Sequence, residues 1–151
     1  MMTEKMQTRA TQKRNYNTFI GQLELVGVRL VSARIENLGY KEYPVNYRIY
    51  VRSESSYTNA EREFEVVHNY KLRMKDVETK RTVAKLSVAF SLTYSSEVPM
   101  TDDIFDIFKV RNLPLNTWPY FREFVHNSFA RVGWVGVVAP VYKVGVSPPK
   151  D

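Results

Sequence analysis

The sequence predicts an α+β fold in which a four-stranded antiparallel sheet is followed by helices. Three observations lead to this prediction. Apolar and polar residues alternate along several successive segments, the links between these segments are short, and the apolar spacing becomes helical after residue 100. The chain has 151 residues, of which 44% are hydrophobic, so it can form one domain with its own core. It contains no cysteine, which excludes disulfides, thiolate metal sites and thiol nucleophiles.

The first two predicted strands come early in the chain. Residues 29–36 alternate within an apolar-rich stretch, so we expect a strand that ends at a turn around Gly39. Pro44 opens a second strand, because residues 45–52 alternate between apolar and polar side chains. Residues 53–60 are polar and are expected to form a connection.

Two longer strands follow, over residues 64–75 and 82–94. In both, every second residue is apolar except His68 in the first of them, which gives each strand one face for a core. The links between successive strands are short, which predicts an antiparallel meander.

Helical spacing replaces this alternation in the last third of the chain. Thr101 is a good N-cap for a short helix over residues 102–108. Asn116 or Thr117 is expected to cap a longer helix that ends at Gly133. The apolar stripe of this longer helix consists of Phe121, Val125, Phe129 and Val132.

The two ends of the chain are expected to lie outside the domain. Residues 1–18 are polar and basic, and we interpret them as a frayed tail, with a nucleic-acid-binding arm as the alternative. The domain is expected to cover residues 19–144, and residues 145–151 form a C-terminal tail.

Net charge and hydropathy limit the setting in which the protein works. The formal net charge is +6, which permits an anionic partner without requiring one. No stretch approaches the roughly 18 apolar residues of a membrane span. The N-terminus has no apolar core like that of a signal peptide. The cytoplasm is therefore the expected location.

Residues that carry chemistry are too few and too scattered for a catalytic site. His68 lies on a predicted strand and His126 on the long helix, so each is interpreted as structural. Asp102, Asp103 and Asp106 lack the spacing of a calcium loop, and two of them suit a helix N-terminus without a metal. There is no glycine-rich phosphate loop. We therefore expect a protein that is not an enzyme and has no cofactor.

The aromatic content instead suggests a contact surface. There are ten tyrosines and eight phenylalanines. One sheet face and one helix stripe would absorb about half of them, and the rest suggest an interface, an oligomer contact or a groove. These remaining aromatic residues include Tyr16, Tyr50, Tyr57, Trp118 and Tyr142.

Residues 112–123 read Asn-Leu-Pro-Leu-Asn-Thr-Trp-Pro-Tyr-Phe-Arg-Glu. This segment resembles a motif of the SecB export chaperones, which consists of Pro, a few residues, and then aromatic-Pro-Tyr-x-Arg-Glu. The residues in register with that motif are Pro114, Trp118, Pro119, Tyr120, Arg122 and Glu123.

Weaker similarities extend the match to roughly residues 23–144. Gly133 and residues 139–141 stand where the family leaves its helix and reaches a Leu-x-Pro-Val segment. Residues 64–67 and the strand after Pro44 are similar to the family's third and second strands.

The resemblance implies a SecB-like fold, with a four-stranded antiparallel sheet and a long C-terminal helix packed on one face. It also implies an ATP-independent holdase that binds non-native polypeptide in apolar grooves. Subunits of the family pair through the first strand and the long helix, so residues 29–36 and 116–132 are expected at a subunit contact in a dimer or tetramer. Many shallow apolar contacts acting together supply the affinity for a client.

Two departures from the family bear on its role. After Tyr142, the family's second C-terminal helix is expected to be missing or vestigial, and the zinc-binding tail of some members is expected to be absent. The export members are acidic where they dock on the export motor, whereas this chain is basic, and a positive face would weaken that docking. A SecB-like chaperone dedicated to one client, such as an antitoxin, therefore fits at least as well as an export chaperone. The basic residues on the polar sheet face are Arg48, Arg52, Lys71, Arg73, Lys75 and Lys85.

The candidate client groove combines apolar residues of the second and fourth strands with aromatic residues near the long helix. Its predicted members are Tyr47, Ile49, Val51, Phe90, Leu92, Tyr94, Trp118 and Tyr142. Trp118 precedes the packed stripe, and Tyr142 lies where the missing helix would cover the sheet, so both rings are expected to be open to a client. The alternative function is a nucleic-acid-binding module that uses the basic sheet face, although the aromatic and glycine signature of single-strand binding is absent.

Overall fold

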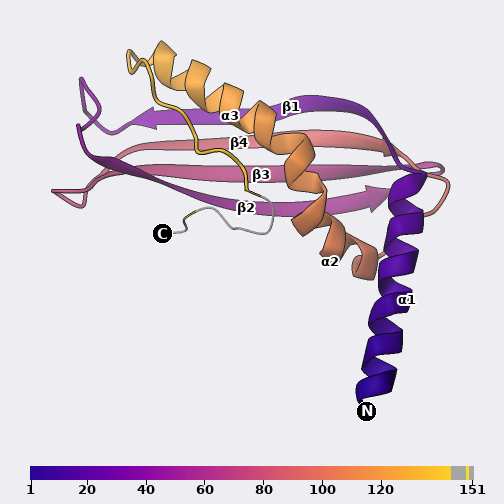
Figure 1. Ribbon diagram of the computed structural model, residues 1–151. Coiled ribbons are helices and arrows are strands. Elements are labelled where there is room, and N and C mark those ends of the chain that lie inside the picture. Colours follow the sequence, from indigo (N-terminus) through magenta and orange to yellow (C-terminus); the bar gives the residue numbers. More distant parts are fainter. Residues whose placement is uncertain (144–148, 150–151) are drawn as a thin grey trace.

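The computed structural model describes residues 1–143 and residue 149. Its centre is an antiparallel sheet of four long strands (Figure 1). The strands are β1 (Glu24–Asn37), β2 (Tyr47–Asn59), β3 (Glu63–Asp76) and β4 (Thr82–Ser95). The third and fourth strands match the predicted ranges to within a residue at each end.

The order of the strands differs from a simple meander. β2, β3 and β4 are neighbours in sequence order, but β1 pairs with β4, so the order is β1-β4-β3-β2. The chain crosses between the two edges of the sheet through residues 38–46. Three strand spacings measure about 14 Å, and a connection of about nine residues can reach roughly 30 Å. The length of the first link therefore permits a crossover that the short links after β2 and β3 do not.

The polar stretch after residue 52 is strand rather than the connection that we expected. β2 continues to Asn59 and pairs with β3 from Ser53 opposite Tyr70 to Asn59 opposite Phe64. Side-chain contacts fix this half of β2. Tyr57 donates a hydrogen bond to Asp102 at 2.6 Å, and the amide of Asn59 exchanges two hydrogen bonds with the backbone of Met100.

Two helices follow the sheet and cover one of its faces (Figure 1): α2 (Asp102–Arg111) and α3 (Leu113–Arg131). Thr101 caps α2 as predicted, since its hydroxyl oxygen accepts the N–H of Ile104 at 3.4 Å.

The long helix begins at Leu113, three residues before the first of the predicted caps. Pro114 lies in its first turn, where a missing N–H costs no helical hydrogen bond. Gly133 follows the helix at φ 86°, a conformation that suits glycine, and its place confirms the predicted end. The predicted stripe faces the sheet, because Phe121, Val125 and Phe129 have no exposed surface.

The N-terminal segment is a helix, α1 (Met2–Gly21), rather than a frayed tail. It projects from one end of the sheet, and only its last turns contact the rest of the chain (Figure 1). Tyr16 donates a hydrogen bond to the side-chain oxygen of Asn112, and the ring of Phe19 lies 6.0 Å from that of Phe64. The predicted boundary after residue 18 therefore falls inside α1. Apart from residue 149, the predicted tail at 145–151 lies outside the described residues.

Candidate functional site

Residues 134–142 turn at Val135 and Gly136 and then run back along α3 without helix or strand, and we call this segment the strap (Figure 1). Side chains of α3 hold it by its carbonyl groups. The indole N–H of Trp118 donates to the carbonyl of Pro140 at 2.9 Å, and Nε of Arg122 donates to that of Ala139 at 3.0 Å. Such bonds pair strap carbonyls that would otherwise lie beside an apolar helix.

Aromatic residues fasten the beginning of the strap to the crossover between β1 and β2. The indole N–H of Trp134 donates to the carbonyl of Lys41 at 3.1 Å, and the hydroxyl of Tyr43 donates to the carbonyl of Val135 at 2.9 Å. The ring of Trp134 also stacks on Phe129 of α3 at 5.8 Å. The strap, the crossover and α3 are therefore joined in one unit.

A pocket of about 230 Å³ opens between the first turns of α3 and the end of the strap. Its floor is aromatic, since the rings of Trp118 and Tyr142 lie 5.8 Å apart. Its rim carries exposed apolar side chains, with 49% of Leu115 and 63% of Val141 accessible to solvent. The residues that line it are Pro114, Leu115, Trp118, Pro119, Arg122, Val141 and Tyr142.

The pocket also has a polar element that comes from a proline inside a helix. Pro119 lies within α3 and has no N–H to donate to the carbonyl of Leu115, four residues before it. Arg122 uses Nε to bind the strap, and its side chain is otherwise exposed. The pocket thus combines an apolar floor with a cation, Arg122, at its edge.

The pocket brings together only part of the predicted groove. Trp118 and Tyr142 meet there, but the prediction that both rings are open is wrong for Trp118. Its ring is only 4% exposed, because the strap lies over it and Phe121 packs beside it at 5.1 Å. Tyr142 is half-buried, and its hydroxyl donates to the carbonyl of Val110 at 3.3 Å.

The predicted groove residues on the sheet lie elsewhere. Four of them are core residues beneath the helices: Val51, Phe90, Leu92 and Tyr94. Tyr47 and Ile49 are half-buried near the start of β2, where Tyr47 packs edge-on against Tyr43 at 5.7 Å. The alternation of apolar residues along β2 and β4 therefore reflects packing in the core.

The family-motif residues divide between the pocket and the outer side of α3. Pro119 and Arg122 line the pocket, whereas Tyr120 is 49% exposed and lies 6.3 Å from the ring of Phe90. Glu123 is exposed and accepts a hydrogen bond from Asn127.

Sequence reasoning missed Pro114, Leu115 and Val141 as pocket residues. The signal available was that apolar side chains flank the motif on both sides. It could not be used without knowing that the strap turns back over the start of α3.

A buried polar network lies beneath the pocket and joins β3 to α3. The hydroxyl oxygen of Thr117 lies 2.9 Å from Nδ1 of His68 and 2.6 Å from the hydroxyl of Tyr70. Thr117 donates its own hydrogen to the carbonyl of Leu113 at 3.2 Å, so the other two groups must donate to it. Burial lowers the pKa of His68 to about 4, and it raises the pKa of Tyr70. His68 is therefore a neutral structural residue at physiological pH.

The free edge of β1 is the second apolar surface. Within residues 1–143 and 149, β1 pairs with β4 on one side only, and most of its residues are exposed. Its exposed large apolar residues are Leu25, Val26, Leu30 and Val31. Residues 29–36, predicted at a subunit contact, therefore lie on an accessible edge strand, of the kind that pairs readily with another chain.

Metal and membrane chemistry add no further candidate. Among residues 1–143 and 149, no three His, Asp or Glu side chains are grouped as metal ligands. None of the helices in that part of the chain is long and apolar enough to cross a membrane.

Comparisons with known proteins agree with this architecture. No protein-family model matches the chain, and no curated protein matches it. Among solved structures, this chain is similar to the SecB-like chaperone Rv1957 of Mycobacterium tuberculosis. That structure shows Rv1957 in complex with a ChAD peptide from the HigA1 antitoxin. The two share 13% sequence identity at a TM-score of 0.72, over 85% of this chain and 97% of that one. The predicted SecB-like α+β fold is confirmed.

Proposed function

Given the fold of a SecB-like chaperone, we propose that this chain is an ATP-independent holdase that binds segments of non-native polypeptide in the cytoplasm. The observation that carries this proposal is the pocket between α3 and the strap. It is apolar, lies at the surface and is rimmed by exposed Leu115 and Val141.

The shape and chemistry of the pocket suit an unfolded chain. A space of about 230 Å³ takes one or two apolar side chains, so it selects for hydrophobicity and reads little sequence. The carbonyl of Leu115, which receives no N–H from Pro119, can accept a backbone N–H of the client. Backbone hydrogen bonding and a small apolar pocket are features that any unfolded polypeptide can use.

The kind of client follows from charge and from the structural neighbour. The neighbour holds an antitoxin peptide, which supports a dedicated client of that type for this chain. Its net charge of +6 weakens the case for a motor that expects an acidic surface. We therefore rank a dedicated client such as an antitoxin ahead of general export cargo.

The core residues of the predicted groove have a different status from the pocket residues. Phe90, Leu92 and Tyr94 lie under α3, so a client reaches them only if α3 or the strap moves. Trp118 belongs to both groups, since it is a buried core residue and also forms part of the pocket floor. In the resting state, the client contacts that we propose are Leu115, Val141 and Tyr142.

Two copies of the chain are proposed to pair along β1. The strand is an edge with exposed Val26, Leu30 and Val31, and pairing would remove both the free backbone edge and this apolar surface from water. Pairing would also place two pockets in one particle, which raises the affinity for a long client. Light scattering of the wild type and of a Val26→Lys/Val31→Lys variant tests this, and a wild type that stays monomeric at micromolar concentration contradicts it.

The function is tested with Leu115→Asp/Val141→Asp, a variant that makes the pocket rim acidic. Both side chains are exposed, so the free energy of unfolding is expected to stay within about 0.5 kcal/mol of the wild type. Suppression of aggregation of a reduced, unfolded client without nucleotide is expected to weaken at least about 10-fold.

Val45→Asp is the matched control, because Val45 is 97% exposed and lies away from the pocket. It should protect the client as the wild type does. Equal protection by all three proteins would remove the pocket from the site, and protection that requires ATP would contradict the holdase.

A further inference from the structure

The outer face of the sheet, opposite α2 and α3, carries a concentrated positive charge. Outward residues near the start of β2, the end of β3 and the start of β4 are nearly all basic. We call this group the basic cluster, and its members are Arg48, Arg52, Lys71, Arg73, Lys75 and Lys85.

The strand register sets these cations directly opposite one another. Arg48 pairs with Lys75 and Arg52 with Lys71 across β2 and β3, and Arg73 pairs with Lys85 across β3 and β4. Opposite residues have Cβ atoms about 5 Å apart, and like charges in such pairs oppose folding. Lys85 also lies opposite Glu36 of β1, so these pairs have one acidic neighbour across the sheet. Three like-charged pairs close together concentrate positive charge on this part of the face.

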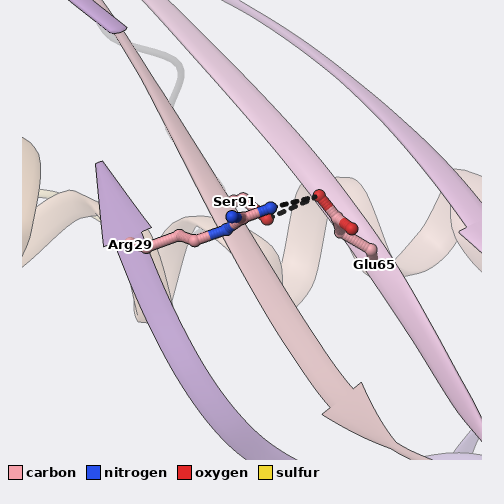
Figure 2. A network of polar contacts seen from close by, with 3 residues as sticks. All are labelled: Arg29, Glu65 and Ser91. Carbon is pink, nitrogen blue, oxygen red and sulfur yellow. Dashed lines mark hydrogen bonds and ion pairs between the residues drawn. The ribbon is translucent and has the colours of Figure 1, made fainter. Parts of the chain in front are cut away.

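At the opposite end of the same face, a cation is paired with a carboxylate of a neighbouring strand (Figure 2). Arg29 of β1 reaches across β4 to Glu65 of β3, with 3.5 Å between the guanidinium nitrogen and the carboxylate oxygen. The hydroxyl of Ser91, on the strand between them, donates to the same carboxylate oxygen at 2.7 Å. At this end of the face, a carboxylate of the sheet is paired with the cation beside it.

We propose that the basic cluster is a docking surface for an acidic polypeptide segment. The favoured partner has carboxylates at alternate residues of an extended stretch. Lys71, Arg73 and Lys75 occur at alternate positions of β3 and are therefore spaced by roughly 6.7 Å, the repeat of alternate side chains in such a segment. Arg48 and Arg52 border this row on β2 and can bind carboxylates in bidentate geometry.

The aromatic content of the face favours a polypeptide over a nucleic acid. Single-stranded nucleic acids bind sheet faces by stacking bases on several aromatic rings. The only aromatic side chain that the four strands place on this face is Tyr50, and Nζ of Lys75 lies over its ring at 5.6 Å. The face offers charge without a stacking platform, which is the chemistry for carboxylates.

The test uses a charge-reversed variant, Arg52→Glu/Lys71→Glu, and a fluorescent 12-residue peptide of alternating Glu and Ser. Both side chains are exposed, and the variant replaces one like-charged pair with another, so we expect its stability to stay close to that of the wild type. Thermal unfolding checks that the variant is folded. Peptide binding at physiological salt is expected to weaken about 30-fold or more. The matched control is Lys5→Glu/Arg9→Glu on α1, which changes the net charge equally at exposed positions and should retain the binding.

Single-stranded RNA of the same charge serves as the competing probe. RNA that binds more tightly than the peptide, equal loss of binding in the control variant, or no peptide binding at physiological salt would each overturn the proposal. Protection of an uncharged unfolded client should be unchanged in Arg52→Glu/Lys71→Glu, because the pocket lies on the other side of the sheet. This last measurement separates the docking surface from the proposed holdase.

Discussion

The helix-covered face and the outer face of the sheet come from alternate residues of the same four strands, so they share one backbone and one register. On the covered face, residues of β3 and β4 such as Val66, Leu72 and Leu92 have at most 1% of their surface exposed. On the outer face, the same strands carry the basic cluster at one end and the Arg29–Glu65 ion pair at the other (Figure 2). The period of two therefore lets one sheet separate two tasks, stability on one side and recognition by charge on the other.

The largest expected effect comes from the covered face. Phe121→Ala removes a ring that has no exposed surface and stacks on Tyr70 at 4.3 Å, so it should cost about 3–5 kcal/mol of unfolding free energy. Urea unfolding measures this. The neighbouring substitution Tyr120→Ala, on the half-exposed side of α3, should cost less than about 1.5 kcal/mol. Equal costs for the two would mean that the covered face is not the stabilising one.

Acid should lower the free energy of unfolding, because buried His68 on the covered face must be protonated. Burial holds the pKa of the folded state at about 4 against an ordinary value of 6.5, so the unfolded chain binds more protons between these values. Stability due to neutral His68 is full above pH 6.5 and is lost as the pH falls toward 4, by roughly 3 kcal/mol. Urea unfolding of the wild type and of His68→Gln between pH 7 and 4 checks this. The difference between the two curves should shrink in acid.

A smaller effect is expected from the hydroxyl at the centre of the buried network. Thr117→Val keeps the shape of the side chain but leaves His68 and Tyr70 without their shared acceptor. The cost is expected to be about 1–3 kcal/mol, because both donors are buried. Thr93→Val, a half-buried position on the outer face of β4, provides the comparison and should change unfolding free energy by less than about 0.5 kcal/mol.

The smallest effect should have the opposite sign. Arg52→Glu turns the like-charged pair with Lys71 into an opposite-charged one, so it should stabilise the fold by about 0.2–1 kcal/mol. The gain should fall as salt rises, since both side chains are exposed. Thermal unfolding at two salt concentrations measures it. A loss of stability at low salt would show that the cations of this pair do not repel each other.

The covered face was also the part of the fold that sequence could predict. β3 and β4 have an apolar residue at every second position except at His68, and their limits were predicted to within a residue. The second half of β2 was missed because residues 53–56 are all polar, and their pairing with β3 depends on the anchors at Tyr57 and Asn59. α1 was missed because it has no apolar stripe and only two buried residues, Tyr16 and Phe19.

The site was predictable only where one element determined it. The motif around Trp118 and Pro119 lies in the first turns of α3, and Tyr142, another residue of the predicted groove, has its ring 5.8 Å from that of Trp118. The burial of Trp118 depends on the path of the strap, which follows from hydrogen bonds between residues distant in sequence. Neither the pairing of β1 with β4 nor the return of the strap leaves a periodic pattern in the sequence, since both depend on contacts between residues distant in sequence.

The way in which the strap is attached has a consequence for how the pocket can evolve. Trp118 and Tyr43 supply side-chain donors, whereas Pro140 and Val135 contribute only carbonyl groups, which every amino acid has. The side chains of Pro140 and Val135 point to solvent, so most substitutions there would leave the attachment intact. Positions 135 and 140 can therefore drift in sequence while the path of the strap is preserved, whereas Trp134, Val137 and Ala139 are buried and hold it in place. New client preferences can arise at the rim of the pocket by single substitutions, without a matching change in the frame that supports it.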